Sequence, residues 1–239
     1  MTLDPADLAN NLDRLEDIEK ASLRHVVQAI YDFRDQAAEM FAMESDLVAD
    51  IGEDITREAL DRMGTATIPI RLFGKMDYKR ARYLFHEDYA VRQALLVDSK
   101  AEDIRDRTSA TIQTAQTSLA ISFRKRGGVE VAEQGTLPTI IPTHGQSLLT
   151  TTIFVKYTYR VVPGAHSELV TITVIALPSG LLQARYNPDS EHTFWRAGRN
   201  APTLNEPFRV RINIAPLQAL KSWRVQHIHL APPSFTWVD

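Results

Sequence analysis

The strongest constraint on the fold of this chain is a short apolar run at residues 95–97 (Leu-Leu-Val), followed directly by Asp98-Ser99-Lys100. Three consecutive apolar residues predict a strand that is buried on both faces, because successive side chains of a strand point to opposite sides of the sheet. A sheet with two covered faces needs a layer of structure on each side. The run therefore predicts a layered α/β protein in which a core strand ends in charged residues.

The rest of the 239-residue sequence contains segments that could form these layers. Apolar residues at helical spacing predict a long amphipathic helix over residues 12–41, a second helix over 53–62 that ends near Gly64, and a third over 108–123. A stretch rich in Gly, Pro and Thr predicts a loop over 127–147. Strands are expected at residues 67–73 (interrupted by Pro69), 77–85, 91–98, 149–161, 168–177, 208–214 and 224–230. No linker separates these segments, so one domain is expected over residues 1–239.

Charge is distributed unevenly along the chain, although the net charge is only −3. Residues 1–66 carry 16 acids and 6 Lys/Arg, while residues 67–239 carry 14 acids and 21 Lys/Arg. Two interpretations remain open: two solvated faces of opposite sign, or a basic working surface for an anionic ligand. The absence of cysteine excludes disulfides, thiolate metal sites and cysteine nucleophiles. An N-terminus without a signal-peptide pattern, and a sequence without a long apolar run, predict a cytoplasmic protein.

The charged end of the buried strand is the main candidate for chemistry. Asp98 and Lys100 are two residues apart, so their side chains should point to the same face. If residues 77–85 and 91–98 form an antiparallel hairpin, Asp77 lies opposite Asp98. Two neighbouring carboxylates suit Mg²⁺, which prefers hard oxygen ligands, and Lys100 could orient the attacking water or stabilise the charge that develops on a phosphate. The alternative is a surface salt bridge at the end of a strand.

This arrangement, an Asp followed after 20 residues by Asp-X-Lys, resembles the signature of the PD-(D/E)XK nucleases, although Met76 replaces the proline of that pattern. The chain as a whole resembles the SfiI-like type II restriction endonucleases. The similar segments occur in the same order from residue 12 to 230, at residues 23–29, 53–56, 76–80, 95–101, 153–155, 185–189, 197–198 and 209–211. The segment 127–150 departs from the family pattern, and we would expect a longer tail after Asp239.

The resemblance implies a restriction-endonuclease fold, with a central mixed sheet flanked by helices and the long N-terminal helix packed beside it. It implies Asp77, Asp98 and Lys100 as the catalytic set, with Mg²⁺ held by the two aspartates and the Ser99 carbonyl. The expected substrate is double-stranded DNA with a GC-rich, interrupted palindrome, in a prokaryotic cytoplasm. A palindrome requires a two-fold symmetric homodimer, and the family also suggests a homotetramer that engages two DNA sites.

Two segments are candidates for reading DNA. In the strand at 208–214, Arg209 and Arg211 share one face about 7 Å apart, which fits successive guanine edges in the major groove. The alternative is an exposed face with solubilising charges. The segment 108–123 has an uncharged polar face on which Gln113 and Gln116 could bond phosphates or bases. Arg124, in a basic Gly-containing segment, could contact phosphate or belong to a surface turn.

Other polar residues favour simpler interpretations. Glu53 could assist the metal site, but a charge on a solvated helix face is the better interpretation. His227 and His229 share a strand face and are interpreted as partly buried strand histidines. Residues 1–66 are thus expected to be helical and acidic, and residues 67–239 to be catalytic and DNA-reading. Two alternatives stay open for function: a structure-selective repair or resolving nuclease with the same fold, and a DNA-binding protein without catalysis.

Overall fold

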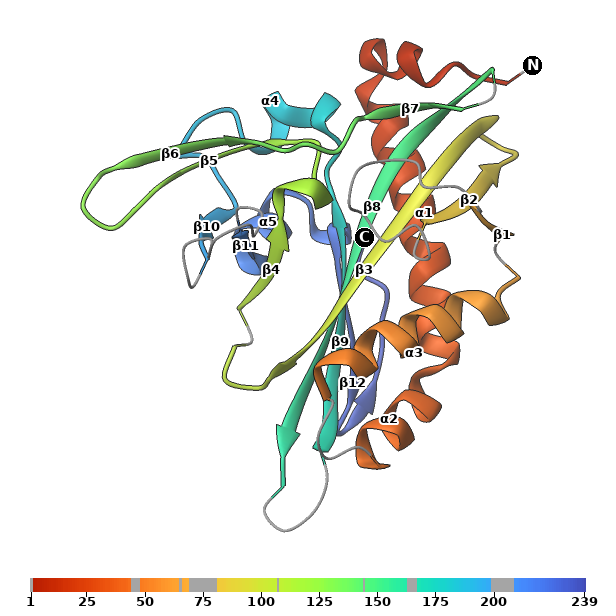
Figure 1. Ribbon diagram of the computed structural model, residues 1–239, viewed down its shortest axis with the longest axis vertical. Helices are drawn as coiled ribbons and strands as arrows, with labels where there is room; N and C mark the ends of the chain where they lie inside the picture. The colour runs from red at the N-terminus through yellow and green to blue at the C-terminus, as the bar shows by residue number, and fades with distance from the viewer. Residues whose placement is uncertain are drawn as a thin grey trace.

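The computed structural model describes residues 2–43, 48–64, 66–68, 81–106, 108–143, 145–162, 167–198 and 209–239. Its main element is a long, mixed β-sheet with helices on one side and a smaller sheet on the other (Figure 1). None of the helices in the described ranges is long and apolar enough to cross a membrane. The predicted α/β fold class, a mixed central sheet flanked by helices, is confirmed.

The N-terminal layer consists of a 3₁₀ turn (Pro5–Asn10) and three helices, α1 (Leu12–Asp32), α2 (Arg34–Met43) and α3 (Val48–Arg62). The single helix predicted over 12–41 is interrupted at Phe33, whose backbone leaves the helical region at φ −96° and ψ 0°. Its apolar stripe nevertheless continues through buried Ala37 and Phe41, so the expected packing face is retained. The second predicted helix starts earlier than expected and ends just before Gly64, whose φ of +70° favours glycine.

The main sheet has the strand order β1-β2-β3-β8-β9-β12-β13, with β7 beside β8. Strands β3 and β8 are parallel, whereas the other neighbours in this sheet are antiparallel. Its strands are β1 (Ala66–Thr67), β2 (Ala81–His86), β3 (Val91–Asp103), β7 (Ile140–Thr143), β8 (Gln146–Val161), β9 (Ser167–Leu177), β12 (Val225–Leu230) and β13 (Pro233–Ser234). The strands predicted at 91–98, 149–161, 168–177 and 224–230 are therefore confirmed, and most are longer than expected.

The predicted β2–β3 hairpin forms, but its register is shifted. Pairing of Asp77 with Asp98 would place Ala81 opposite Ala94, whereas the structure places Ala81 opposite Leu96. The cause is the turn, which spans the four residues between His86 and Val91 and ends at Ala90 with a φ of +53°. Its centre lies one residue further along the chain than pairing of Asp77 with Asp98 would require. A shift of two residues keeps each side chain on its predicted face. Asp77 itself, like the segment 69–80, lies outside the described residues.

The prediction of a helix over residues 108–123 is wrong. The chain instead forms β4 (Ser109–Gln113), a 3₁₀ turn (Thr114–Gln116) and β5 (Ala120–Arg124). From Ala110 to Gln113 buried residues alternate with partly exposed ones, and this period of two suits the pairing of β4 with β11. The predicted loop at 127–147 is also partly wrong, because β6 (Glu130–Gln134) pairs with β5, and β7 and the start of β8 lie in the same region.

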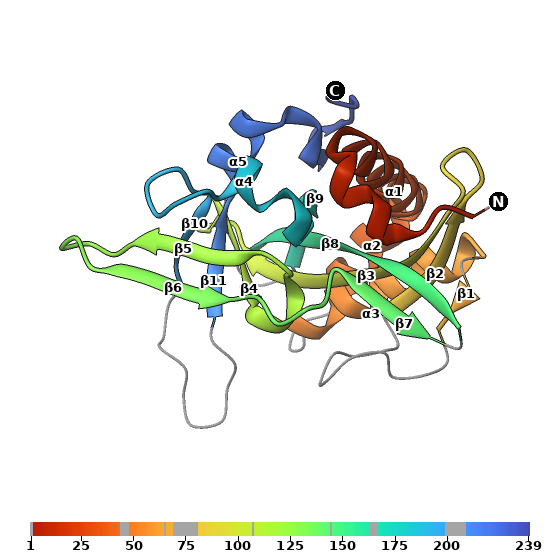
Figure 2. The ribbon, with the colours of Figure 1, turned by 90° about the horizontal axis from the view of Figure 1, so that it is seen from above.

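The small sheet has the order β10 (Trp195–Ala197), β11 (Arg209–Asn213) and β4, and it packs against the main sheet opposite the helices. Seen from above, the β5–β6 hairpin extends away from the body of the molecule (Figure 2). One apolar core lies between α1–α3 and the main sheet, and a second, which includes Phe194 and Trp195, lies beneath the small sheet. Short helical segments complete the C-terminal half: Gly180–Leu182, α4 (Gln183–Tyr186), α5 (Ile214–Leu220) and Ser222–Arg224.

Candidate functional site

Strand β3 presents different chemistry on its two faces. Val97 belongs to the core beneath the helices, and the Ser99 hydroxyl donates a hydrogen bond of 3.0 Å to the carbonyl of Gly52 in α3. Asp98 and Lys100 therefore point the other way, toward the small sheet, on a common face as predicted. The Asp98 side chain is buried, with 7% of the residue exposed. The Lys100 ammonium donates to the Thr111 carbonyl of β4 at 3.1 Å.

A close helix–strand contact fixes the position of this part of β3. A Cβ atom on Gly52 would approach the Tyr157 ring to 3.0 Å and the Ala101 nitrogen to 3.2 Å, so any other residue would force small shifts where α3 meets the sheet. The Tyr157 hydroxyl shares a hydrogen bond of 2.9 Å with Thr56 of the same helix, and burial raises the pKa of this phenol. This contact fixes one face of β3, and Asp98 and Lys100 project from the opposite face.

The residues present are of the type that Mg²⁺ requires, although the described part of the chain contains no group of three His, Cys, Asp or Glu side chains that could hold a metal. Asp98 offers a buried carboxylate on the strand face that also carries Lys100. The Ser99 carbonyl would add a second hard oxygen, and Asp77, the other expected ligand, lies outside the described residues. Carboxylate and carbonyl oxygens suit Mg²⁺, which fills its remaining positions with water and phosphate oxygens.

Lys156 is a charged residue of this region that sequence reasoning missed. It pairs with Lys100 across the parallel β3–β8 ladder and is only 1% exposed. Its ammonium lies 2.6 Å from a carboxylate oxygen of Glu102 and donates to the carbonyls of Asp106 and, at 2.5 Å, Ser109. The available signal was a lysine inside the otherwise apolar strand segment 153–157, because a lysine buried there requires partners.

The small sheet gathers arginines on one face. Arg209 lies opposite Gln113 of β4, and Arg211 lies opposite Thr111 of β4 on one side and Arg196 of β10 on the other. Directly opposed residues share a face, so these cations and the Gln113 amide are neighbours. The predicted alternation of β11 is confirmed, with Val210 and Ile212 fully buried on the other face.

Asp106 holds Arg211 at the edge of this surface. Its carboxylate is 3.2 Å from the Arg211 guanidinium and accepts a hydrogen bond of 2.9 Å from the Ser109 hydroxyl. Burial opposes ionisation of Asp106, but the Ser109 hydrogen bond and the charges of Lys156, Arg211 and Arg196 outweigh it and lower the pKa. Asp106 is therefore charged at neutral pH, and Arg211 is held in one place while remaining partly accessible, with 11% of its side chain exposed.

Gln116 is less available than expected. The Gln116 side-chain oxygen accepts a hydrogen bond of 2.7 Å from the backbone nitrogen of Gln113, which closes the short turn after β4. Gln113 itself belongs to the strand rather than to a helix face, and it lies beside Arg209. Gln113 thus belongs to the arginine surface, the face of the small sheet that carries Arg196, Arg209 and Arg211. Gln116 stabilises the turn after β4.

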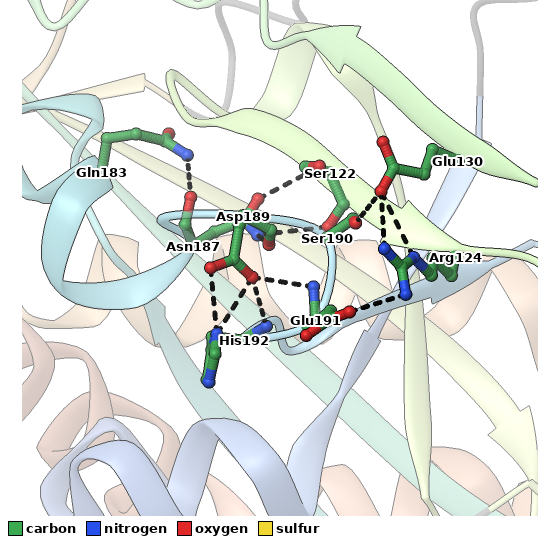
Figure 3. Close-up of polar contacts among 9 residues, drawn as sticks. All are labelled: Ser122, Arg124, Glu130, Gln183, Asn187, Asp189, Ser190, Glu191 and His192. Atoms are coloured by element: carbon green, nitrogen blue, oxygen red, sulfur yellow. Dashed lines mark hydrogen bonds and ion pairs between the residues drawn. The ribbon is translucent and has the colours of Figure 1, made fainter. Parts of the chain in front are cut away.

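Arg124 lies at the end of β5 and is held by two carboxylates (Figure 3). Its guanidinium contacts Glu191 at 2.6 Å and Glu130 at 3.1 and 3.2 Å. Glu130 also accepts a hydrogen bond of 2.7 Å from Ser190. Arg124 is about half exposed, so it remains near the surface, but a phosphate would have to compete with these acids.

The loop that carries Glu191 is ordered by its own hydrogen bonds, which Figure 3 also shows. Asp189 accepts bonds from the backbone and imidazole of His192 and from the backbone of Glu191, and these lower the pKa of Asp189 to about 2. Asn187 donates to the Ser122 carbonyl at 3.1 Å and thereby fastens the loop to β5. This loop and the β5–β6 hairpin therefore form one unit.

The remaining candidates are Glu53 and the two histidines of β12. Glu53 is on the exposed side of α3. His227 and His229 stack on one face of β12 with ring centroids 6.2 Å apart, and each imidazole meets a threonine hydroxyl of β9. Burial, together with the neighbouring His229, lowers the pKa of His227. His227 is partly buried, as expected, whereas His229 is exposed at the strand surface.

Comparisons with known proteins identify the family to which the chain belongs. The model of the type II restriction enzyme SfiI family matches residues 15–228. The type II restriction enzyme SfiI of Streptomyces fimbriatus is 35% identical over 237 residues, which cover 94% of this chain and 87% of that protein. The crystal structure of tetrameric restriction endonuclease SfiI bound to cognate DNA superimposes with a TM-score of 0.82 at 33% identity, over 96% of this chain and 88% of that one.

A second solved structure extends the likeness of fold. The restriction endonuclease BglI, bound to its DNA recognition sequence, matches with a TM-score of 0.76 at 16% identity, over 95% of this chain and 94% of that one. At this identity the match supports the fold alone. The family model and the full-length relative carry the assignment: the chain belongs to the SfiI family of type II restriction enzymes and is a site-specific deoxyribonuclease.

Proposed function

We propose that this restriction endonuclease makes Mg²⁺-dependent double-strand breaks at a GC-rich, interrupted palindrome. The observation that carries the proposal is the contact between the Lys100 ammonium and the Thr111 carbonyl, because it joins the candidate catalytic strand to the arginine-bearing sheet. An enzyme that cleaves DNA only at one recognition sequence needs catalytic residues and DNA-reading residues within one assembly. The single domain expected over residues 1–239 supplies them from strands that pack face to face.

Within the candidate catalytic site we assign Asp77, Asp98 and Lys100. Asp77, Asp98 and the Ser99 carbonyl would hold Mg²⁺, which when bound supplies a Lewis acid beside the scissile phosphate and makes water more acidic. Asp98 is buried, so its carboxylate is held in place by the strand. Lys100, on the same face, would orient the attacking water and offset the negative charge that grows on the phosphate oxygens.

For base readout we assign Arg209 and Arg211. Guanidinium groups on one strand face, about 7 Å apart, can each bond the O6 and N7 atoms of a guanine in the major groove. Gln113 lies beside Arg209 and could bond a base edge or a phosphate, and Gln116 would hold the turn after it. Arg124, on the projecting hairpin, would contact phosphate after exchanging a carboxylate partner.

The enzyme works on DNA as an assembly of identical subunits, as its tetrameric, DNA-bound relative does. We propose that a two-fold dimer reads the two halves of the palindrome, because one arginine surface can read only one half-site. Two such dimers would form a tetramer that holds two DNA sites, in the prokaryotic cytoplasm. Light scattering with and without cognate duplex separates the dimer from the tetramer.

The proposal is tested by incubating the enzyme with a sequenced plasmid and Mg²⁺, and by mapping the ends. We expect discrete cuts at one GC-rich interrupted palindrome. Cleavage of branched DNA regardless of sequence would instead indicate a structure-selective nuclease, and binding without cleavage would indicate a DNA-binding protein.

The assignment of the site is tested with Asp98→Ala. Removing the buried carboxylate should reduce single-turnover cleavage by at least about a thousandfold, the scale seen when a principal electrostatic contact in a site is lost. DNA binding measured in EDTA should be retained, because one negative charge near the phosphate is removed. Lys100→Ala should also abolish cleavage while leaving metal binding largely intact. Cleavage by Asp98→Ala within tenfold of the wild type would show that the site is misplaced.

A further inference from the structure

Lys156 occupies an environment that is costly for a charged group. Its ammonium is almost completely buried in the middle of β8, and Lys100 lies directly beside it on β3. Removing an ammonium ion from water costs several kcal/mol unless good partners replace the water. Glu102, two residues after Lys100 on β3, supplies the opposite charge at 2.6 Å. A charge with almost no contact to solvent cannot itself touch DNA, so its effect must pass through its partners.

The other two partners of Lys156 are backbone carbonyls, those of Asp106 and Ser109. They belong to the connection that leaves β3 after Asp103 and enters β4 at Ser109. A single ammonium therefore fixes the middle of this connection and its junction with β4 against β8. Hydrogen bonds from a charged donor are roughly twice as strong as neutral ones, which makes this the main anchor of the connection among the contacts described.

The same connection positions the arginine surface. The Asp106 carboxylate, held by the Ser109 hydroxyl at 2.9 Å, lies 3.2 Å from Arg211. Thr111, two residues after Ser109, pairs with Arg211 in the small sheet and accepts the hydrogen bond from Lys100. Two lysines on neighbouring strands thus bind carbonyls of one short segment. Lys100 on β3 binds that of Thr111, and Lys156 on β8 binds those of Asp106 and Ser109.

We propose that Lys156 is a positioning residue that couples base readout by Arg211 to strand cleavage at Asp98 and Lys100; this rests on the site assignments of the proposed function. Lys156 fixes Asp106, and Asp106 fixes Arg211 in the orientation that a guanine requires. The same anchor keeps the Thr111 carbonyl in register with Lys100. Without it, both the preference for cognate DNA and the rate of cleavage should fall, because small displacements of contacting groups have large effects on both.

The test uses the full-length Lys156→Met protein, which keeps the length of the side chain and removes the charge. The double variant Glu102→Gln/Lys156→Met also removes the carboxylate that would be left buried without its partner, so it separates loss of the anchor from the cost of an unpaired charge. Arg160→Met is the matched control, because Arg160 lies further along β8 and forms an exposed ion pair with Glu168.

Two quantities are measured for each variant. The first is the ratio of dissociation constants for cognate duplex and for a duplex with one changed G·C pair, in EDTA. The second is the single-turnover cleavage rate at saturating enzyme with Mg²⁺. We expect both lysine variants to lose about tenfold or more in each, within the range for a disturbed bidentate contact. Arg160→Met should match the wild type in both, and thermal unfolding identifies any variant that is not folded.

A purely structural role predicts a lower unfolding temperature with an unchanged binding ratio and rate, and that result for the double variant would overturn the proposal. If neither lysine variant folds, Asp106→Asn must reproduce the loss of binding preference, because it acts on the partly exposed end of the same chain of contacts; a wild-type ratio there also overturns it. Absence of sequence preference in the wild-type enzyme, or cleavage by Asp98→Ala, would instead contradict the proposed function.

Discussion

Among the residues that the structure describes, we compare two largely buried ionic clusters of similar composition. The helix cluster joins α1 to the C-terminal half through Glu16, Glu19, Tyr186 and Arg224. The loop cluster consists of Glu102, Asp106, Lys156 and Arg211. Each contains a lysine or arginine with 1% or less of its surface exposed and a carboxylate within 2.7 Å of it.

The helix cluster is centred on a cation that lies wholly inside the protein, with 0% of the Arg224 side chain exposed. Arg224 contacts Glu19 at 2.7 Å and stacks on the rings of Tyr186 and Trp223, with its guanidinium carbon 4.3 and 4.4 Å from their centroids. Glu19 also accepts a hydrogen bond of 2.8 Å from the backbone of Ser179. Glu19, Tyr186 and Arg224 come from distant parts of the chain and are almost completely buried, so they join elements of the fold. At the edge of the cluster, Glu16 also meets the partly exposed cations of Arg185 at 3.5 Å and Lys221 at 3.6 Å.

The loop cluster, in contrast, leads from the core to the surface. From Lys156, with 1% of its side chain exposed, the contacts lead to Asp106, with 25% exposed, and then to Arg211, with 11% exposed. A charge held rigidly at one end and accessible at the other can meet a ligand in a fixed orientation, which reduces the entropy lost on binding. Burial of an ion pair therefore does not distinguish a structural role from a functional one. The two clusters differ in that the loop cluster ends in Arg211, on the sheet face proposed to read DNA.

The largest expected effect is a loss of stability in Arg224→Met, which removes the cation of the helix cluster. The substitution leaves Glu19 buried without its cation, and loss of one partner of a buried pair costs about 3–5 kcal/mol. Urea unfolding should show a decrease of this size in the free energy of unfolding. At a temperature where the variant is folded, its preference for cognate over scrambled duplex should equal that of the wild type. A loss of preference would show that the helix cluster also affects readout.

A smaller effect, on discrimination between DNA sequences rather than on stability, is expected for Arg211→Ala. Loss of one bidentate guanine contact should cost about 1–3 kcal/mol of discrimination at a particular base pair, with little change in the unfolding midpoint. Competition titrations with cognate and scrambled duplexes at two salt concentrations measure this. If Arg211→Ala weakens both duplexes equally, β11 follows the DNA backbone and the assignment of base readout is wrong.

The smallest effect is expected for Arg124→Ala, because this residue belongs to neither cluster. Its ion pairs with Glu130 and Glu191 are exposed, and such pairs contribute little to stability. Loss of a phosphate contact should weaken cognate and scrambled DNA alike and reduce the salt dependence of log K by about one unit. An unchanged salt slope would indicate that Arg124 stays with its carboxylates when DNA binds.

Several features of the protein were determined by the sequence alone. The run at 95–97 and the alternation around Asp98 and Lys100 predicted a core strand with two charged side chains on one face, and strand β3 has both. The alternation at Arg209 and Arg211 likewise predicted the faces of β11 correctly. These inferences rest on the two-residue period of a strand, which depends on neighbouring residues only. The order of similar segments along the chain was enough to identify the family.

Tertiary structure decided the rest. Residues 108–123 fit a helical period, yet Ser109–Gln113 forms a strand because β11, almost a hundred residues later in the chain, supplies hydrogen bonds and a shared apolar face. The β2–β3 register depended on a four-residue turn that the strand patterns do not specify. The partners of Lys156 lie 47–54 residues away along the sequence, in a strand and a connection that meet β8 only after folding. Local periodicity specifies which way a side chain points, whereas what it meets depends on segments that only the folded chain brings together.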